Sequence, residues 1–66
     1  MRLTTINKAI ETYGYELVRG NGYFYFYPLT DATPELYDSS VMTTTLGKDL
    51  KFWITELEFG IRHTYL

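Results

Sequence analysis

The sequence Tyr23-Phe24-Tyr25-Phe26-Tyr27 is a run of five aromatic residues between the turn sequence Gly-Asn-Gly at 20–22 and Pro28. An apolar run of this length between turn residues is typical of a β-strand. Because successive side chains of a strand point to opposite faces, Phe24 and Phe26 share one face and the three tyrosines share the other. The run therefore predicts a sheet with the phenylalanines in the core and the phenols on an exposed or partner-covered face.

A second strand is predicted over residues 15–19, immediately before the turn. Asn21-Gly22 favours a two-residue type I′ hairpin, in which both central residues need a positive φ. The resulting register is Leu17 opposite Phe26 and Val18 opposite Tyr25. It places Tyr15 and Leu17 on the phenylalanine side. The other face then carries five side chains, which are Glu16, Val18, Tyr23, Tyr25 and Tyr27.

The first of two amphipathic helices is predicted over residues 5–13. Thr4 is its expected N-cap, because a threonine hydroxyl accepts a hydrogen bond from a free N–H of the first turn. Gly14 is its expected left-handed C-terminal residue. Its apolar positions recur at helical spacing, and they are Ile6, Ala9, Ile10 and Tyr13.

The second helix is predicted over residues 50–59, with Asp49 as its N-cap and Gly60 at its end. Its core-facing positions are Leu50, Trp53, Ile54, Leu57 and Ile61. Phe52 and Phe59 lie seven residues apart, on a common second face of this helix. We expect that face to be buried as well, with a dimer seam or partner groove as the alternative.

Between the helices, residues 29–39 read as a surface loop with one helical turn at 34–37, and Leu36 and Tyr37 are expected to pack on the sheet. Residues 40–46 are rich in β-branched side chains and predict a third strand. Its inward set is open: either Met42, Thr44 and Leu46, or Val41, Thr43 and Thr45. Gly47-Lys48 then turns the chain.

These elements predict one α+β domain over residues 1–66, in the order α-β-β-β-α. Two amphipathic helices on one face of a three-stranded antiparallel sheet bury the phenylalanine side. This arrangement gives the tyrosine side no covering layer.

Composition narrows the class of function. The 66 residues include no cysteine and carry a formal net charge of −2, so disulfides and thiolate metal sites are excluded and phosphate-dependent nucleic-acid binding is disfavoured. The only histidine, His63, lies near the C-terminus, and no spacing of acidic residues and histidine matches a metal site. We therefore expect a binding protein and no enzyme, with no catalytic residue, cofactor or metal. Without an apolar leader or a long apolar segment, we expect a cytoplasmic protein with no membrane partner.

The tyrosines allow three interpretations: support of the sheet, a protein-binding surface, or a platform for single-stranded nucleic acid. Nucleic acid is the least favoured, because only Arg19 lies near this face and Glu16 opposes a phosphate. A protein partner is either a host or phage protein or a second copy of the chain. The candidate partner-binding residues are Tyr23, Tyr25, Tyr27 and Val18, with Asp31, Glu35 and Asp38 as an acidic rim.

Several stretches form a recognisable set: TINKAI at 5–10, YGYELV at 13–18, GNGYFYF at 20–26, SSV at 39–41, and Leu46, Leu50, Trp53 and Glu56-Leu57-Glu58. The set resembles small phage and prophage proteins of Gram-negative bacteria, and it departs from them at 42–45 and 47–49. The resemblance implies an origin in a mobile element and a location in a bacterial host. Small phage accessory proteins often bind and block a host protein, CRISPR effector complexes included, and the resemblance extends that expectation to this chain.

Overall fold

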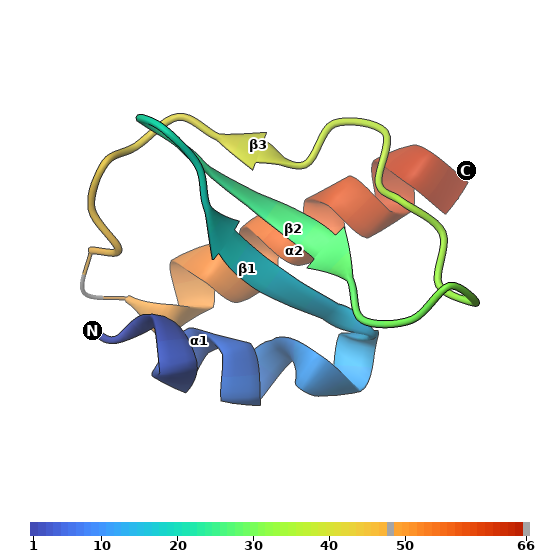
Figure 1. Ribbon diagram of the computed structural model, residues 1–66, viewed down its shortest axis with the longest axis horizontal. Coiled ribbons are helices and arrows are strands. Elements are labelled where there is room, and N and C mark those ends of the chain that lie inside the picture. Colours follow the sequence, from blue (N-terminus) through green and yellow to red (C-terminus); the bar gives the residue numbers. More distant parts are fainter. Residues whose placement is uncertain (48, 66) are drawn as a thin grey trace.

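A computed structural model describes residues 1–47 and 49–65. Its elements are α1 (Leu3–Ile10), the 3₁₀ helix η1 (Glu11–Tyr13), β1 (Tyr15–Arg19), β2 (Phe24–Pro28), β3 (Ser40–Val41) and α2 (Leu50–Tyr65). The strands form one antiparallel sheet in the order β1-β2-β3. In Figure 1, α2 crosses behind the sheet and α1 lies along its β1 side. The predicted α+β fold is confirmed.

The register between β1 and β2 is the predicted one. Leu17 faces Phe26, and Val18 faces Tyr25. The alternation of burial along both strands follows from this register, because one residue of slippage would exchange the two faces. On the phenylalanine face, Phe24 and Phe26 of β2 and Tyr15 and Leu17 of β1 are accordingly buried.

The turn between these strands has the predicted position and a different conformation. Gly20 N–H donates to the carbonyl of Tyr23 at 2.8 Å, which closes a two-residue loop. Gly22 has a φ of 87°, whereas no non-glycine residue in the described ranges has a positive φ, Asn21 included. The type I′ prediction is therefore wrong. In this turn, only Gly22 takes a left-handed φ, which glycine adopts without a steric cost.

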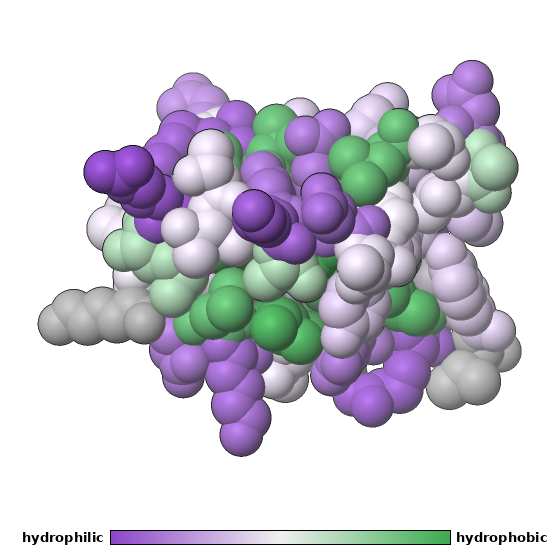
Figure 2. Space-filling view, turned by 90° about the horizontal axis from the view of Figure 1, so that it is seen from below, coloured by the Kyte–Doolittle hydropathy of each residue, from purple (hydrophilic) through white to green (hydrophobic). Residues whose placement is uncertain are grey.

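The core lies between the sheet and the two helices. Its buried side chains are Ile6, Ile10, Tyr15, Leu17, Phe24, Phe26, Leu36, Trp53 and Leu57. Trp53 packs edge-on against Phe24 with 5.5 Å between ring centroids, and its indole N–H donates to the carbonyl of Leu46 at 2.6 Å. Seen from the side of α1, a band of hydrophobic side chains remains visible between hydrophilic ones (Figure 2). A domain of this size leaves part of its apolar surface exposed.

Both ends of the first helix differ in detail from the prediction. The helix begins at Leu3, and its N-cap is Arg2 with no side-chain capping bond, so the Thr4 cap is wrong. Leu3 packs against the core, which accounts for the earlier start. The last turn tightens into η1, which turns Tyr13 outward, away from the core stripe. Gly14 has a φ of 90° and ends the element as predicted.

The second helix is longer than predicted. Asp49 caps it as expected, since its Oδ1 accepts from the Lys51 N–H at 2.9 Å. Gly60 does not end the helix, which continues to Tyr65. A Cβ on Gly60 would lie 3.2 Å from Leu36 Cδ1, so this glycine allows the 29–39 segment to pack closely on the helix. Lys48 of the predicted turn and Leu66 lie outside the described residues.

The outer face of α2 is not buried, contrary to the expectation for its two phenylalanines. Phe52 is 46% exposed and Phe59 is 61% exposed. The sheet and α1 cover only the stripe that holds Trp53 and Leu57. Phe52 and Phe59 are therefore surface residues.

The segment after β2 has no helical turn at 34–37. Leu36 is buried as expected, whereas Tyr37 is 83% exposed. Three hydrogen bonds hold this segment to the rest of the fold. Leu29 N–H donates to the Gly14 carbonyl at 2.9 Å, the Tyr15 hydroxyl donates to the Pro34 carbonyl at 2.6 Å, and Tyr37 N–H donates to Thr64 Oγ1 at 2.8 Å. Burial of Tyr15 and its bond to the Tyr65 hydroxyl raise the pKa of the Tyr15 phenol, so the phenol stays neutral.

The third strand is much shorter than predicted. It covers only Ser40–Val41 and pairs with Phe24 and Tyr25 of β2. Val41 packs against the core, Met42 is 80% exposed, and Leu46 returns to the core. Neither predicted inward set is right, because the chain leaves the sheet after Val41 and the alternation ends there.

Candidate protein-binding surface

The face of the sheet opposite the core carries Glu16, Val18, Tyr23, Tyr25 and Tyr27, and we call it the Tyr face. No element covers it within the ranges that the structure describes, and Tyr27 is 49% exposed. The other four side chains are half-buried. On the reverse side of the same strands Leu17, Phe24 and Phe26 are almost completely buried. The rings of the Tyr face are therefore available to a partner.

The three tyrosine rings form a continuous row. The centroids of Tyr23 and Tyr25 are 5.9 Å apart at an interplanar angle of 36°, and those of Tyr25 and Tyr27 are 6.4 Å apart at 83°. Tilted and edge-to-face pairs at such distances attract one another. Tyr25 touches both neighbours and is the centre of the row. Mutual contact restricts the rings before any partner arrives, which lowers the entropic cost of binding.

Gly20 determines where the first ring of the row lies. A Cβ built on Gly20 would be only 2.5 Å from Cζ of Tyr23. The Tyr23 ring thus lies directly across the backbone of the opposite strand, in space that any side chain at position 20 would occupy. This packing of an aromatic ring over a cross-strand glycine extends the flat Tyr face to the hairpin.

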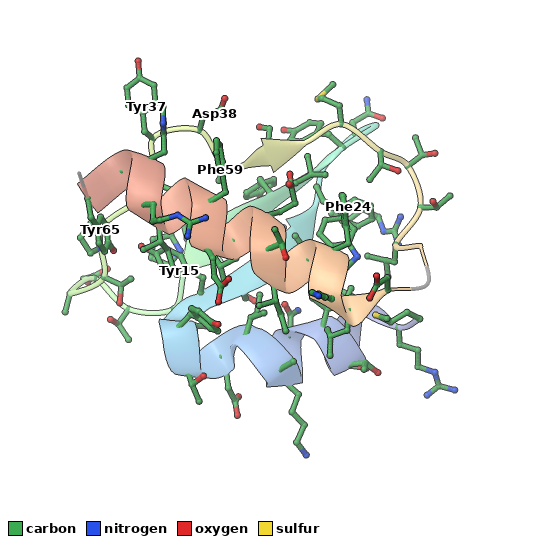
Figure 3. The ribbon with its side chains drawn as sticks, turned by 180° about the vertical axis from the view of Figure 1, so that it is seen from behind. Tyr15, Phe24, Tyr37, Asp38, Phe59 and Tyr65 are labelled. Carbon is green, nitrogen blue, oxygen red and sulfur yellow. The ribbon has the colours of Figure 1, made fainter. Side chains whose placement is uncertain are left out.

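The three residues of the predicted acidic rim lie in two different places in the structure. Asp31 and Glu35 line one hollow of about 390 Å³ together with Tyr27 and the intervening loop. Asp38 lines another hollow with Glu56 and Phe59, beside α2 (Figure 3). Asp31 and Glu35 therefore border the Tyr face at Tyr27, and Asp38 belongs to a different surface.

Arg19 lies on the opposite side from the one expected. Its guanidinium carbon is 4.7 Å from the centroid of the Phe24 ring, on the core side of the sheet. The strand alternation explains this position, because Arg19 shares a face with Leu17. Its positive charge is engaged by the Phe24 ring and is directed away from the tyrosines.

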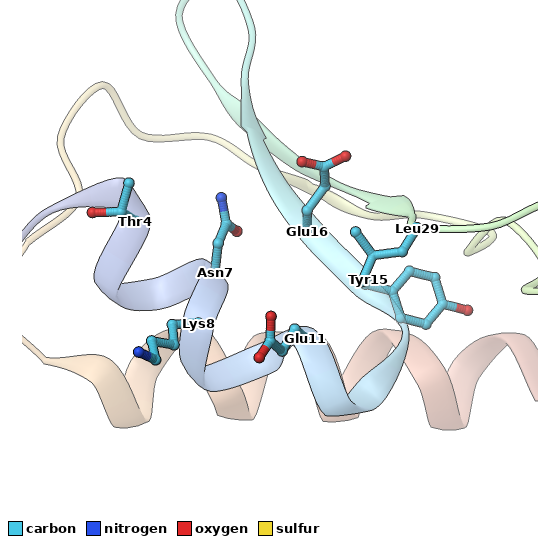
Figure 4. A pocket seen from close by; sticks show the side chains of 7 residues that line it. All are labelled: Thr4, Asn7, Lys8, Glu11, Tyr15, Glu16 and Leu29. Atoms are coloured by element: carbon cyan, nitrogen blue, oxygen red, sulfur yellow. The ribbon is translucent and has the colours of Figure 1, made fainter.

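A second concave region lies between α1 and β1, lined by Thr4, Asn7, Lys8, Glu11, Tyr15, Glu16 and Leu29 (Figure 4). Asn7 has a structural role there. Its Oδ1 accepts from Leu17 N–H at 2.6 Å, and its Nδ2 donates to the Leu17 carbonyl at 3.2 Å. The amide thus replaces a neighbouring strand at the edge of β1. Asn7 lies outside the predicted apolar stripe of the helix, and no residue spacing distinguishes it.

A smaller aromatic cluster that the sequence did not predict lies on α2 near its C-terminal end. Phe59 stacks on His63 with 6.1 Å between centroids, and Tyr37 meets His63 edge-on at 5.8 Å. The spacing of four residues between Phe59 and His63 is a helical signal. This spacing did not indicate a contact in the sequence analysis, because the helix was expected to end at Gly60 and His63 lay beyond it. In the part of the chain that the structure covers, no three His, Cys, Asp or Glu residues form a group that could hold a metal ion.

Comparison of the chain with protein-family models, with curated proteins and with solved structures found no match. Across residues 1–47 and 49–65, no helix is long and apolar enough to cross a membrane. The fold and its surface define a small α+β domain with an uncovered aromatic sheet face. Its function has to be inferred from the geometry and charge of that face.

Proposed function

We propose that this protein acts by binding another protein through the Tyr face and performs no catalysis. The observation that carries the proposal is the row of three mutually contacting tyrosine rings on an uncovered sheet face. Tyrosine buries a large area at a low entropic cost and is enriched among residues that dominate binding energy. Tyr25 is the central anchor, Tyr23 and Tyr27 flank it, and Val18 lies opposite Tyr25 on the neighbouring strand.

The narrower proposal concerns the partner. The resemblance of the sequence to small phage and prophage proteins supports a phage-derived inhibitor that blocks a host protein complex, as anti-CRISPR proteins do. Such an inhibitor needs a rigid surface and no chemistry of its own. The edge of β1 is closed by Asn7, so the Tyr face is better suited to docking than strand addition at that edge.

Capture from a bacterial host lysate, with identification by mass spectrometry, tests this proposal. The variant carries threonine at positions 23, 25 and 27, because threonine keeps the strand propensity while it removes the rings. We expect one protein or complex to be enriched with the wild type and lost with the variant. Equal enrichment with both would contradict the proposal.

The alternative use of the same rings is a homodimer in which two Tyr faces meet. Mass measured by light scattering separates the two functions, because the single chain has a mass of 7.8 kDa. A mass of one chain at all concentrations supports a heterologous partner. A mass of two chains that falls to one in the threonine variant assigns the Tyr face to self-association.

A further inference from the structure

The charged side chains that border the Tyr27 end of the Tyr face are acidic. Glu16 lies on the face itself, directly opposite Tyr27 in the register. Asp31 and Glu35 line the hollow that also includes Tyr27. The Tyr27 end of the row is therefore bordered by three carboxylates that come from β1 and from the segment after β2.

Basic side chains are placed elsewhere in the part of the chain that the structure describes. Arg2 is the N-cap of α1, Lys51 and Arg62 belong to α2, and Arg19 packs over Phe24 on the core side. Lys8 of α1 is the exception, because it lines the hollow between α1 and β1 together with Glu16. A protein that binds a phosphate backbone needs Lys or Arg next to its aromatic platform. The Tyr face has the opposite arrangement, with aromatic rings and acids together.

Resting on the proposed function, we infer that the Tyr face accepts an arginine-bearing protein surface. A guanidinium is planar, stacks on aromatic rings and forms paired hydrogen bonds with a carboxylate. Tyr27 supplies an exposed ring with carboxylates on two sides, Glu16 across the strands and the pair Asp31 and Glu35 at the hollow. The hollow of about 390 Å³ has room for one such side chain. Tyr23 and Tyr25 extend the contact as an uncharged platform.

This chemistry prefers arginine to lysine. An ammonium group is compact and strongly hydrated, and it does not stack on a ring as a guanidinium does. A face that only attracted positive charge would bind both side chains equally. Selectivity for arginine is therefore the signature that separates the inferred site from general attraction to an acidic protein.

The test is a titration of ¹⁵N-labelled protein with blocked hexa-arginine, hexa-lysine and hexa-glutamate peptides, followed by NMR chemical shifts. We expect hexa-arginine to shift the amides of Glu16, Tyr25 and Tyr27 most. Hexa-lysine should bind about threefold to tenfold more weakly. The variant Glu16→Gln/Asp31→Asn/Glu35→Gln should bind hexa-arginine about tenfold more weakly than the wild type.

The matched control neutralises three acids away from the Tyr face, with Asp38→Asn/Glu56→Gln/Glu58→Gln. It makes the same change in net charge, so equal weakening in both variants would overturn the inference. Shifts spread evenly over the helices, or equal binding of the arginine and lysine peptides, would do the same. A single-stranded oligothymidine that shifts the Tyr face at low salt would assign it to nucleic acid instead.

The outcomes also separate this inference from the function on which it rests. If a protein captured from the lysate needs the tyrosines but binds the Gln/Asn variant as tightly as the wild type, the arginine inference fails and the proposed function stands. If hexa-arginine binds as expected and no lysate protein depends on the tyrosines, the site chemistry stands and the proposed function fails.

Discussion

Trp53→Ala is expected to leave most of the protein unfolded at 25 °C. Trp53 is 1% exposed, packs against Phe24 and donates its indole N–H to the Leu46 carbonyl at 2.6 Å. Truncation of a buried tryptophan costs about 3–5 kcal/mol. A single core in a domain below about 70–80 residues rarely supplies more than about 3–5 kcal/mol in total. The loss is therefore comparable to the whole free energy of unfolding.

Far-UV circular dichroism and urea titration measure this loss. Phe52→Ala is the matched control, because Phe52 immediately precedes Trp53 in the same helix, touches the Trp53 ring and is 46% exposed. We expect this control to unfold with a free energy within about 1 kcal/mol of the wild type. Trp53→Phe, which retains a ring but leaves the Leu46 carbonyl without its donor, should fall between the two. A folded Trp53→Ala protein would show that the core is organised differently.

Asn7→Ala is expected to lower the free energy of unfolding by about 2 kcal/mol. Both main-chain groups of Leu17 lose their partner, the N–H at 2.6 Å and the carbonyl at 3.2 Å. An unpaired buried polar group costs about 1–3 kcal/mol, and the higher helix propensity of alanine offsets part of the loss. For a domain of this size the melting temperature should fall by about 8–16 °C.

Hydrogen exchange at the Leu17 amide tests the mechanism of this loss. In the wild type the amide is protected by Asn7, and in Asn7→Ala we expect it to exchange much faster than the amides between β1 and β2. Lys8→Ala changes the neighbouring exposed residue of α1 and should alter neither stability nor exchange. Unchanged protection of Leu17 in Asn7→Ala would mean that the side chain does not close the edge of β1.

The sequence predicted the hairpin of β1 and β2 well, because its side chains alternate between apolar and polar with the period of a strand. Phe24 and Phe26 lie on one face of the strand and three tyrosines lie on the other. Only one register with the preceding strand gives a consistently apolar face, and the structure has that register. The conformation of the turn was less determined. Asn21-Gly22 fixes the position of a tight turn, but only the glycine requires a left-handed φ, and Asn21 adopts a negative one.

The errors came from contacts between distant segments. Gly60 has the residue type that commonly ends a helix, yet here it admits Leu36 from a segment more than 20 residues earlier. Local sequence carries no sign of that contact. The hydrogen bonds between Asn7 and Leu17 could not be predicted from the sequence for the same reason. For the candidate site, the tyrosines and Val18 were placed together correctly by parity, whereas the position of Asp38 depends on how an irregular segment folds back.

The central claim is that Tyr25 is a binding residue and that the fold does not require its ring. The most direct measurement is quantitative capture from a bacterial lysate by three proteins of known stability: wild type, Tyr25→Thr and Phe59→Ala. Phe59 is the matched control, an aromatic residue that is 61% exposed on α2, away from the Tyr face. We predict that Tyr25→Thr remains folded and loses the captured partner, whereas Phe59→Ala retains it. A folded Tyr25→Thr protein that captures the same partner at the wild-type level would contradict the account.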